Sequence, residues 1–166
     1  MAIDTPVSQI VGPGFDDSSS TARVPVGTIM KGTNGSEWMY VIAQSAIAQY
    51  DCVAILNSSS AVGASICASP MTTTFAAKST RVGFAQTALA AAGYGWVALS
   101  GSNLRCNVAI ACEPAVPLYT TATGGVLDDA VVSAGYVAGC VAMSSAASAS
   151  AVPVVGGFAN IETISV

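Results

Sequence analysis

The chain has few residues that could do acid–base or nucleophilic chemistry. It contains no histidine, which excludes Ser-His-Asp and Cys-His nucleophile systems, histidine-ligated zinc and an imidazole base near neutral pH. Lys31 and Lys78 could act as bases only if they were desolvated, and neither has a serine three residues upstream as a Ser-x-x-Lys site requires. We therefore interpret both as solvated lysines and predict no catalytic residue.

Two adjacent carboxyl pairs, Asp16-Asp17 and Asp128-Asp129, are the other candidates for chemistry. Either pair could offer oxygen ligands to calcium, but neither has the alternating spacing of a calcium-binding loop. Acids that hydrolyse a glycosidic bond must be held across a cleft, which a sequence alone does not show. We predict that both pairs are solvated and that the chain binds neither metal nor cofactor. A small hydrolase or sugar-binding lectin domain that uses these acids is a rival interpretation.

The segment Gly93-Tyr94-Gly95-Trp96-Val97-Ala98 matches the loose glycine fingerprint of dinucleotide-binding loops, and Glu113 lies downstream where a ribose-binding acid would be. Such a loop needs a helix whose N-terminus faces the pyrophosphate. Residues 96–99 are instead typical of a strand and end at Ser100-Gly101. We predict a glycine-containing β-turn here.

The cysteines are odd in number and include no Cys-x-x-Cys pair. Several lie in alternating apolar runs, so we predict buried thiols rather than disulfides or metal ligands. The N-terminus lacks a basic and apolar leader, so we expect synthesis in a cytosol. The cysteines are Cys52, Cys67, Cys106, Cys112 and Cys140.

Short strands must position all these residues. The chain has 166 residues, of which 52% are apolar and 8% charged, against about 25% charged in an average protein. Apolar runs of period two recur between Gly, Asn, Ser and Pro, and convincing amphipathic helices do not. This pattern predicts an all-β fold, a single compact β-barrel or β-sandwich. The clearest local prediction is a hairpin at Asn34-Gly35.

Charge and hydropathy exclude two classes of partner. A net charge of −4 leaves no basic field for phosphate, so we expect no nucleic-acid binding. The mean hydropathy of +0.62 first suggests a membrane protein. However, the uncharged stretches 52–77, 82–104 and 130–161 are interrupted by polar residues, glycine or proline, whereas a spanning helix needs about 20 predominantly apolar residues in a row. We predict no membrane association.

The N-terminal part differs from the rest. Residues 1–20 are predicted to form an extended arm that can dock but cannot make its own core, and residues 21–166 a single β domain. Trp38 and Tyr40, and likewise Tyr94 and Trp96, form aromatic clusters; we predict core packing for at least one member of each pair, while others could anchor an interface. The predicted interface residues are Ile3, Val7, Ile10, Val11, Phe15, Trp38, Tyr40 and Trp96.

Two stretches resemble a known family. Residues 81–86 (RVGFAQ) with 91–101 (AAGYGWVALSG), and residues 116–129 (VPLYTTATGGVLDD) with 137–142 (VAGCVA), are similar to segments of small head decoration proteins, or cement proteins, of tailed bacteriophages. Together these segments cover about the C-terminal half of the chain. The serine- and alanine-rich stretch 144–151 departs from the family pattern.

The resemblance implies a barrel-like or tulip-like β domain on the outside of a phage head. Such proteins are non-enzymatic, bind the major capsid protein where capsomers meet, often as homotrimers, and stabilise the shell. They are made in the bacterial cytoplasm and end on the outer surface of the virion. A low charge fits such a role, because interface cores are depleted in charged residues. The alternative is another β-rich virion component, such as a tail, fibre or receptor-binding subunit.

Overall fold

The computed structural model describes residues 14–32, 34–57, 66–76, 81–131 and 135–162. The fold is all-β, as predicted, with a single four-residue helix in the described part, α1 (Thr73–Ala76). The strands are β1 (Ser18–Ser19), β2 (Ile29–Lys31), β3 (Glu37–Ala43), β4 (Cys52–Asn57), β5 (Ile66–Pro70), β6 (Arg81–Phe84), β7 (Tyr94–Val108), β8 (Pro117–Thr120), β9 (Leu127–Asp128), β10 (Tyr136–Ala142) and β11 (Ser150–Glu162).

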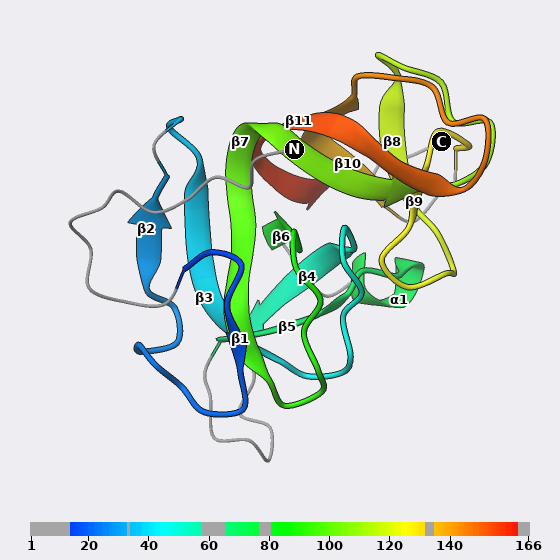
Figure 1. Ribbon diagram of the computed structural model, residues 1–166. Coiled ribbons are helices and arrows are strands. Elements are labelled where there is room, and N and C mark those ends of the chain that lie inside the picture. Colours follow the sequence, from blue (N-terminus) through cyan, green and yellow to red (C-terminus); the bar gives the residue numbers. More distant parts are fainter. Residues whose placement is uncertain (1–13, 33, 58–65, 77–80, 132–134, 163–166) are drawn as a thin grey trace.

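The long strand β7 organises the sheet. Its first part pairs antiparallel with β3, from Tyr94 to Ser100. Its second part pairs antiparallel with β11, from Ser100 to Val108. β7 therefore runs through both parts of the molecule, as Figure 1 shows.

The strand pairings close two circuits that share β7. In the first circuit β3 pairs with β5, β5 with β4, β4 with β6, β6 with β7, and β7 again with β3. In the second circuit β7 pairs with β9, β9 with β8, β8 with β10, β10 with β11, and β11 again with β7. A single pairing between Asn160 and Arg81 joins β11 to β6, so the circuits also touch there.

Side chains on opposite faces of the strands form two hydrophobic cores. Successive side chains of a strand point to opposite faces, so Val97 and Leu99 of β7 join one core while Trp96 and Ala98 join the other. Burial of such side chains stabilises the fold by about 1.5–3 kcal/mol each. The first core also contains Met39, Val41, Val53, Ile55 and Ala68, which come from β3, β4 and β5.

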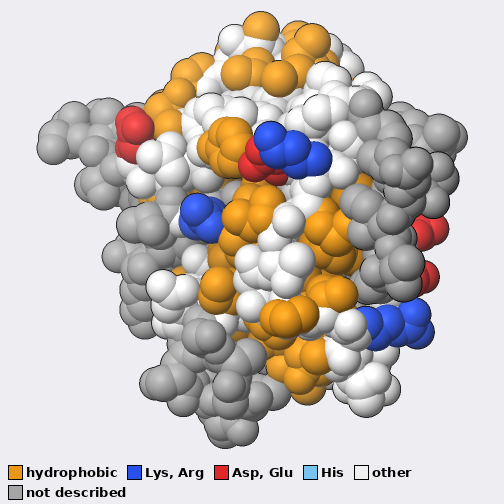
Figure 2. Space-filling view, turned by 90° about the vertical axis from the view of Figure 1, so that its left-hand side faces the viewer, with side chains coloured by type: hydrophobic (Ala, Val, Ile, Leu, Met, Phe, Trp, Pro, Cys, Tyr) orange, Lys and Arg blue, Asp and Glu red, His pale blue; other side chains and the backbone are white. Residues whose placement is uncertain are grey.

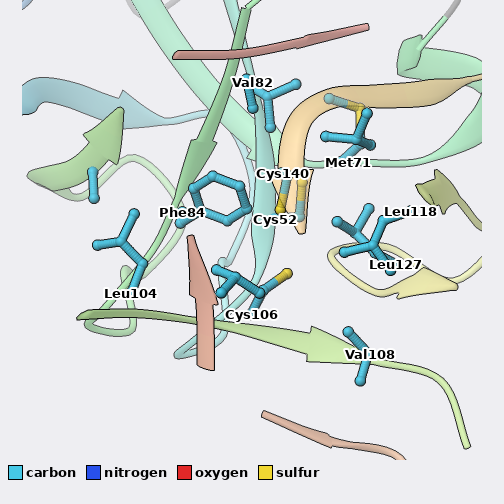
Figure 3. Close-up of a cluster of buried hydrophobic side chains, with 14 of the residues drawn as sticks. Cys52, Met71, Val82, Phe84, Leu104, Cys106, Val108, Leu118, Leu127 and Cys140 are labelled. Atoms are coloured by element: carbon cyan, nitrogen blue, oxygen red, sulfur yellow. The ribbon is translucent and has the colours of Figure 1, made fainter. Parts of the chain in front are cut away.

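The other core lies on the opposite face of the first circuit's strands and extends into the second circuit. Phe84 of β6 and Cys52 of β4 meet side chains of β7 and β10 there, with Leu118 and Leu127 close by (Figure 3). Because one continuous set of buried side chains contacts both circuits, the described residues pack as one body. Its β7 and β10 members include Leu104, Cys106, Val108 and Cys140.

The predicted hairpin is confirmed. β2 pairs antiparallel with β3, from Ile29↔Met39 to Lys31↔Glu37. Gly35 has a φ of +82°, a left-handed conformation that glycine adopts without strain.

The described end of the predicted arm belongs to the β fold. Ser18 and Ser19, which lie in the predicted arm, form β1 and pair with Gly95 and Tyr94. Phe15 is 1% exposed, and its ring stacks on that of Trp38 at a centroid distance of 4.6 Å. The segment from Phe15 to Ser19 thus covers part of β3 and β7. Residues 1–13, with the predicted interface residues Ile3, Val7, Ile10 and Val11, lie outside the described residues.

Candidate interaction surface

The residues predicted to be solvated make local contacts. The Nζ atom of Lys31 lies 3.2 Å from Oε1 of Glu37, and Lys31 is largely exposed. Asp17 accepts a hydrogen bond from the N–H of Gly14 at 3.0 Å and lies 3.5 Å from Nη1 of Arg23. Such exposed pairs contribute about 0–1 kcal/mol. Lys78 lies outside the described residues.

The second acidic pair also accepts hydrogen bonds from backbone N–H groups. Oδ1 of Asp128 accepts the N–H of Asp129, and Oδ2 of Asp129 accepts the N–H of Glu113, both at 2.9 Å. The carboxylate of Asp129 thus links the end of β9 to the turn at Glu113, 16 residues earlier in the sequence. Among the residues that the structure describes, no three His, Cys, Asp or Glu side chains form a group that could hold a metal ion.

The cysteines are buried free thiols, as predicted. Burial, together with the nearby carboxylates of Asp129 and Asp128, raises the pKa of Cys112 to about 11. A hydrogen bond with Cys52, and then burial, raise the pKa of Cys106 well above its ordinary value. A thiol is a nucleophile only when ionised, so these two groups are inert at neutral pH.

The glycine segment is a turn that leads straight into a strand, as predicted. The N–H of Gly93 donates to the carbonyl of Ala90 at 2.9 Å, and β7 begins at Tyr94. Since β7 continues to Val108, no helix follows this turn, and the dinucleotide cradle is not formed.

The aromatic residues expected at an interface belong to the core, and this corrects the expectation. Phe15, Trp38, Tyr40 and Trp96 are each 1% exposed. The Trp96 ring packs edge-on against Phe15 at 5.4 Å and against Tyr40 at 5.1 Å. The physical reason is that the N-terminal segment covers the side of β3 and β7 from which these rings project. None of the four offers a surface to a partner.

A buried polar cluster, which the sequence analysis missed, joins the two circuits. Asp51 accepts hydrogen bonds from the N–H of Ala48 at 2.8 Å and from Nδ2 of Asn107 at 3.1 Å. Gln86 donates to the carbonyl of Arg105 and accepts its N–H, both at 3.0 Å. The side chain of Gln86 thus pairs with β7 as a neighbouring strand would. These contacts satisfy buried polar groups, and we assign them a structural role.

Exposed apolar side chains form a face on the second circuit, with Arg105 of β7 at its border, opposite Pro153. Val141 of β10 lies directly opposite Val155 of β11 and opposite Pro117 of β8. The N–H of Met143 donates to the carbonyl of Pro153 at 2.8 Å, which places these two residues side by side in the next row. We call Pro117, Val141, Met143, Pro153 and Val155 the β10–β11 face.

The exposure of this face is large for apolar side chains. Met143 is 59% exposed, Val155 42% and Val141 39%. The sequence has no charged residue from 130 to 161, so β10 and most of β11 carry no charge. Contiguous exposed apolar side chains commonly mark an interaction site. The sequence of these strands predicts their alternation between two faces. Because valine occurs on both faces, the sequence does not show which face is buried.

Charge is also sparse on the side of the molecule that carries β2. Figure 2 shows hydrophobic side chains running down the middle of this view, with a few Lys, Arg, Asp and Glu side chains around them. Ile29 of β2 is 49% exposed. Low surface charge is thus not confined to the β10–β11 face.

The described part of the chain contains no helix with the length and apolar character needed to cross a bilayer. Comparison of the chain with protein-family models, with curated proteins and with solved structures gives no match.

Proposed function

We propose that this chain is a non-enzymatic structural protein of a virion, which binds the outside of a tailed-bacteriophage head and stabilises it. The observation that carries the proposal is the β10–β11 face. A row of apolar side chains across three strands, without a charge, is suited to bury against a protein shell, since interface cores are depleted in charge. The partner in this proposal is the major capsid protein.

Two further features support a structural rather than catalytic role. The carboxylates of Asp17, Asp128 and Asp129 accept hydrogen bonds from backbone N–H groups. The described cysteines are buried. In addition, residues 81–86, 91–101, 116–129 and 137–142 resemble segments of decoration proteins. For the fold, we propose that each of the two strand circuits closes as a small β-barrel, the two barrels sharing β7.

Binding to expanded heads that lack the protein tests the proposal. In the double variant Val141→Thr/Val155→Thr each valine is replaced by a side chain of similar shape that keeps β-branching, so the strands should form while the face becomes polar. The matched control is Ile29→Thr, which changes an exposed β2 residue elsewhere.

Wild type and the control should saturate the heads at the same concentration, and the double variant should need about tenfold more protein, since loss of an interface anchor typically costs more than 1 kcal/mol. Equal binding by all three would overturn the assignment of the face. Failure of wild type to bind heads, with binding to tails or to host cells instead, would overturn the decoration role in favour of a tail, fibre or receptor-binding subunit.

A further inference from the structure

An exposed aromatic ring stands beside a hollow at the point where the two circuits touch. Phe158 of β11 is 59% exposed and has a φ of +52°, which a bulky residue rarely adopts. Beside it is an open hollow of about 140 Å³. We call it the Phe158 hollow, and it is lined by Arg81, Val82, Leu99, Phe158, Ala159 and Asn160.

A β-bulge holds this ring in place. The pairing of β10 with β11 shifts between Ala138 and Cys140, so Gly139 alone faces residues 157–159. Bulges re-aim side chains and are common next to functional sites. Glycine would adopt the backbone conformation of Phe158 with less strain. Because strained residues cluster at sites that clamp a ligand, the hollow beside Phe158 is a candidate binding site.

The hollow lies at the end of the first circuit's core. Ala159 of β11 belongs to the other core, so its neighbour Asn160 points to the opposite face of the strand. Leu99, which belongs to the first circuit's core, lines the hollow on this face. The hollow therefore combines apolar side chains with a polar one. Ligand sites have this composition, because a few polar groups fix the orientation of a ligand held by apolar contacts.

Asn160 supplies the polar group for a ligand. Its side chain is exposed, and among the residues that the structure describes none forms a hydrogen bond with its amide. An amide is both a donor and an acceptor, so it can bond to a hydroxyl group in either direction. We assign no ligand contact to Arg81, which already interacts within its own chain.

The size and lining of the hollow fit one sugar ring. An engineered cavity of about 150 Å³ accommodates benzene, so a hollow of about 140 Å³ has room for one six-membered ring. A purely apolar ring would be better held in a closed, dry cavity, whereas this hollow is open. A pyranose has C–H groups on its faces, which can pack on the negative face of an aromatic ring. Its hydroxyl groups can bond to the amide of Asn160 and to water.

We propose that the Phe158 hollow binds the terminal pyranose ring of a saccharide chain. A C–H face of the sugar packs on the ring of Phe158, and the side-chain amide of Asn160 bonds to its hydroxyl groups. The rest of the saccharide leaves through the open side of the hollow, since there is room for one ring only. The site uses neither of the acidic pairs. It is independent of the proposed head binding, because it contains neither Val141 nor Val155.

Titration of the purified full chain with methyl glycosides, followed by NMR, tests the proposal. The probes are the α- and β-methyl glycosides of glucose, galactose, mannose and N-acetylglucosamine, which imitate the end of a saccharide chain. At least one should bind with a Kd of about 1 mM, the strength expected of a ligand of this size. The aromatic signals of Phe158, identified as those absent from the spectrum of Phe158→Gly, should shift on binding.

Substitutions in the hollow separate sugar binding from folding. Phe158→Gly suits the positive φ, so it should keep a cooperative melt and yet bind the same sugar at least about tenfold more weakly. Phe158→Tyr keeps a flat ring and should bind like wild type. Asn160→Ala should weaken binding by about fivefold, the usual effect of one lost hydrogen bond.

Two controls and a longer ligand complete the test. Ile29→Ser, at an exposed position on β2, should bind the sugar like wild type, as should Val141→Thr/Val155→Thr. The disaccharide with the same terminal sugar and linkage, such as maltose for methyl α-glucoside, should bind at least as tightly as the methyl glycoside. Absence of binding by every methyl glycoside, equal binding by Phe158→Gly, loss of binding in Phe158→Tyr or in either control, or rejection of the disaccharide would each overturn the proposal.

Discussion

Asp51 is a carboxyl that lies between the two circuits with only 6% of its surface exposed. A Cβ on Gly125, whose φ is +80°, would collide with its carboxyl group, so glycine is required there for the carboxyl to fit. Burial raises the pKa of Asp51 above its ordinary value, although the hydrogen bonds from Ala48 and Asn107 act in the opposite direction. The residue that joins the circuits is thus sensitive to pH.

The sign of this pH dependence follows from proton linkage. Because the pKa of Asp51 is higher in the folded chain than in the unfolded chain, the folded state binds more protons between the two values. The contribution of Asp51 to stability is therefore greatest below the unfolded pKa of about 4 and decreases as the pH rises through the folded value. Asp51→Asn should remove this component from the pH profile of the unfolding free energy, measured by urea titration at each pH.

The matched control for Asp51 is Asn107→Ala. This variant keeps the carboxyl and removes a hydrogen bond that favours its charged form. It should therefore retain the decline in stability with pH, or steepen it. A wild-type profile that differs from that of Asp51→Asn by a constant at every pH would contradict the role of this carboxyl, since a constant offset reflects lost contacts and not titration.

The strands could be predicted from the sequence pattern, but the segment that covers each strand face could not, as the N-terminal segment shows. Alternation in the sequence correctly indicated strands and the Asn34-Gly35 hairpin, because a strand's period and a turn's φ requirement are local properties. The partner of each strand face is not local. Trp38 and Trp96 looked suited to an interface, but Phe15, which is distant in sequence from both, covers them.

Truncation separates the two parts of the predicted arm. Deletion of residues 2–17 removes Phe15 from the core, a loss of about 3–5 kcal/mol for a buried Phe side chain, whereas deletion of residues 2–13 leaves Phe15 and β1 in place. We expect a much lower unfolding midpoint for the longer deletion than for the shorter one, together with red-shifted tryptophan emission.

Phe15→Ala in the full chain is the control for the truncations, and it should reproduce most of the difference between them. If both deletions unfold at the same midpoint, the packing of Phe15 on Trp38 does not stabilise the fold. Only the shorter deletion is suited to testing whether residues 2–13 contribute to head binding, because the longer one also perturbs the core.

The whole molecule depends on β7, which no pattern in the sequence marked as shared. The sequence pattern predicts that the strand of residues 96–99 ends at Ser100-Gly101, because Ser100-Gly101-Ser102-Asn103 has the composition of a turn. In the structure the chain continues as one strand through these residues and changes partner from β3 to β11 at Ser100. Pairing with two different neighbours sustains a strand through residues of low β propensity.

This shared strand predicts that the two circuits unfold together. If the second circuit opened alone, the second part of β7 would lose β11, and the core that contains both Trp38 and Cys140 would be divided. Two probes can therefore be compared during urea unfolding: the emission of Trp38 and Trp96, which lie on the first circuit, and the reactivity of the thiols of Cys106 and Cys140, which lie on the second. We expect coincident midpoints, as in a two-state transition. Thiol labelling at a lower urea concentration than the change in emission would mean that the second circuit opens independently, and β7 would then be a connection between two units instead of the common element of one.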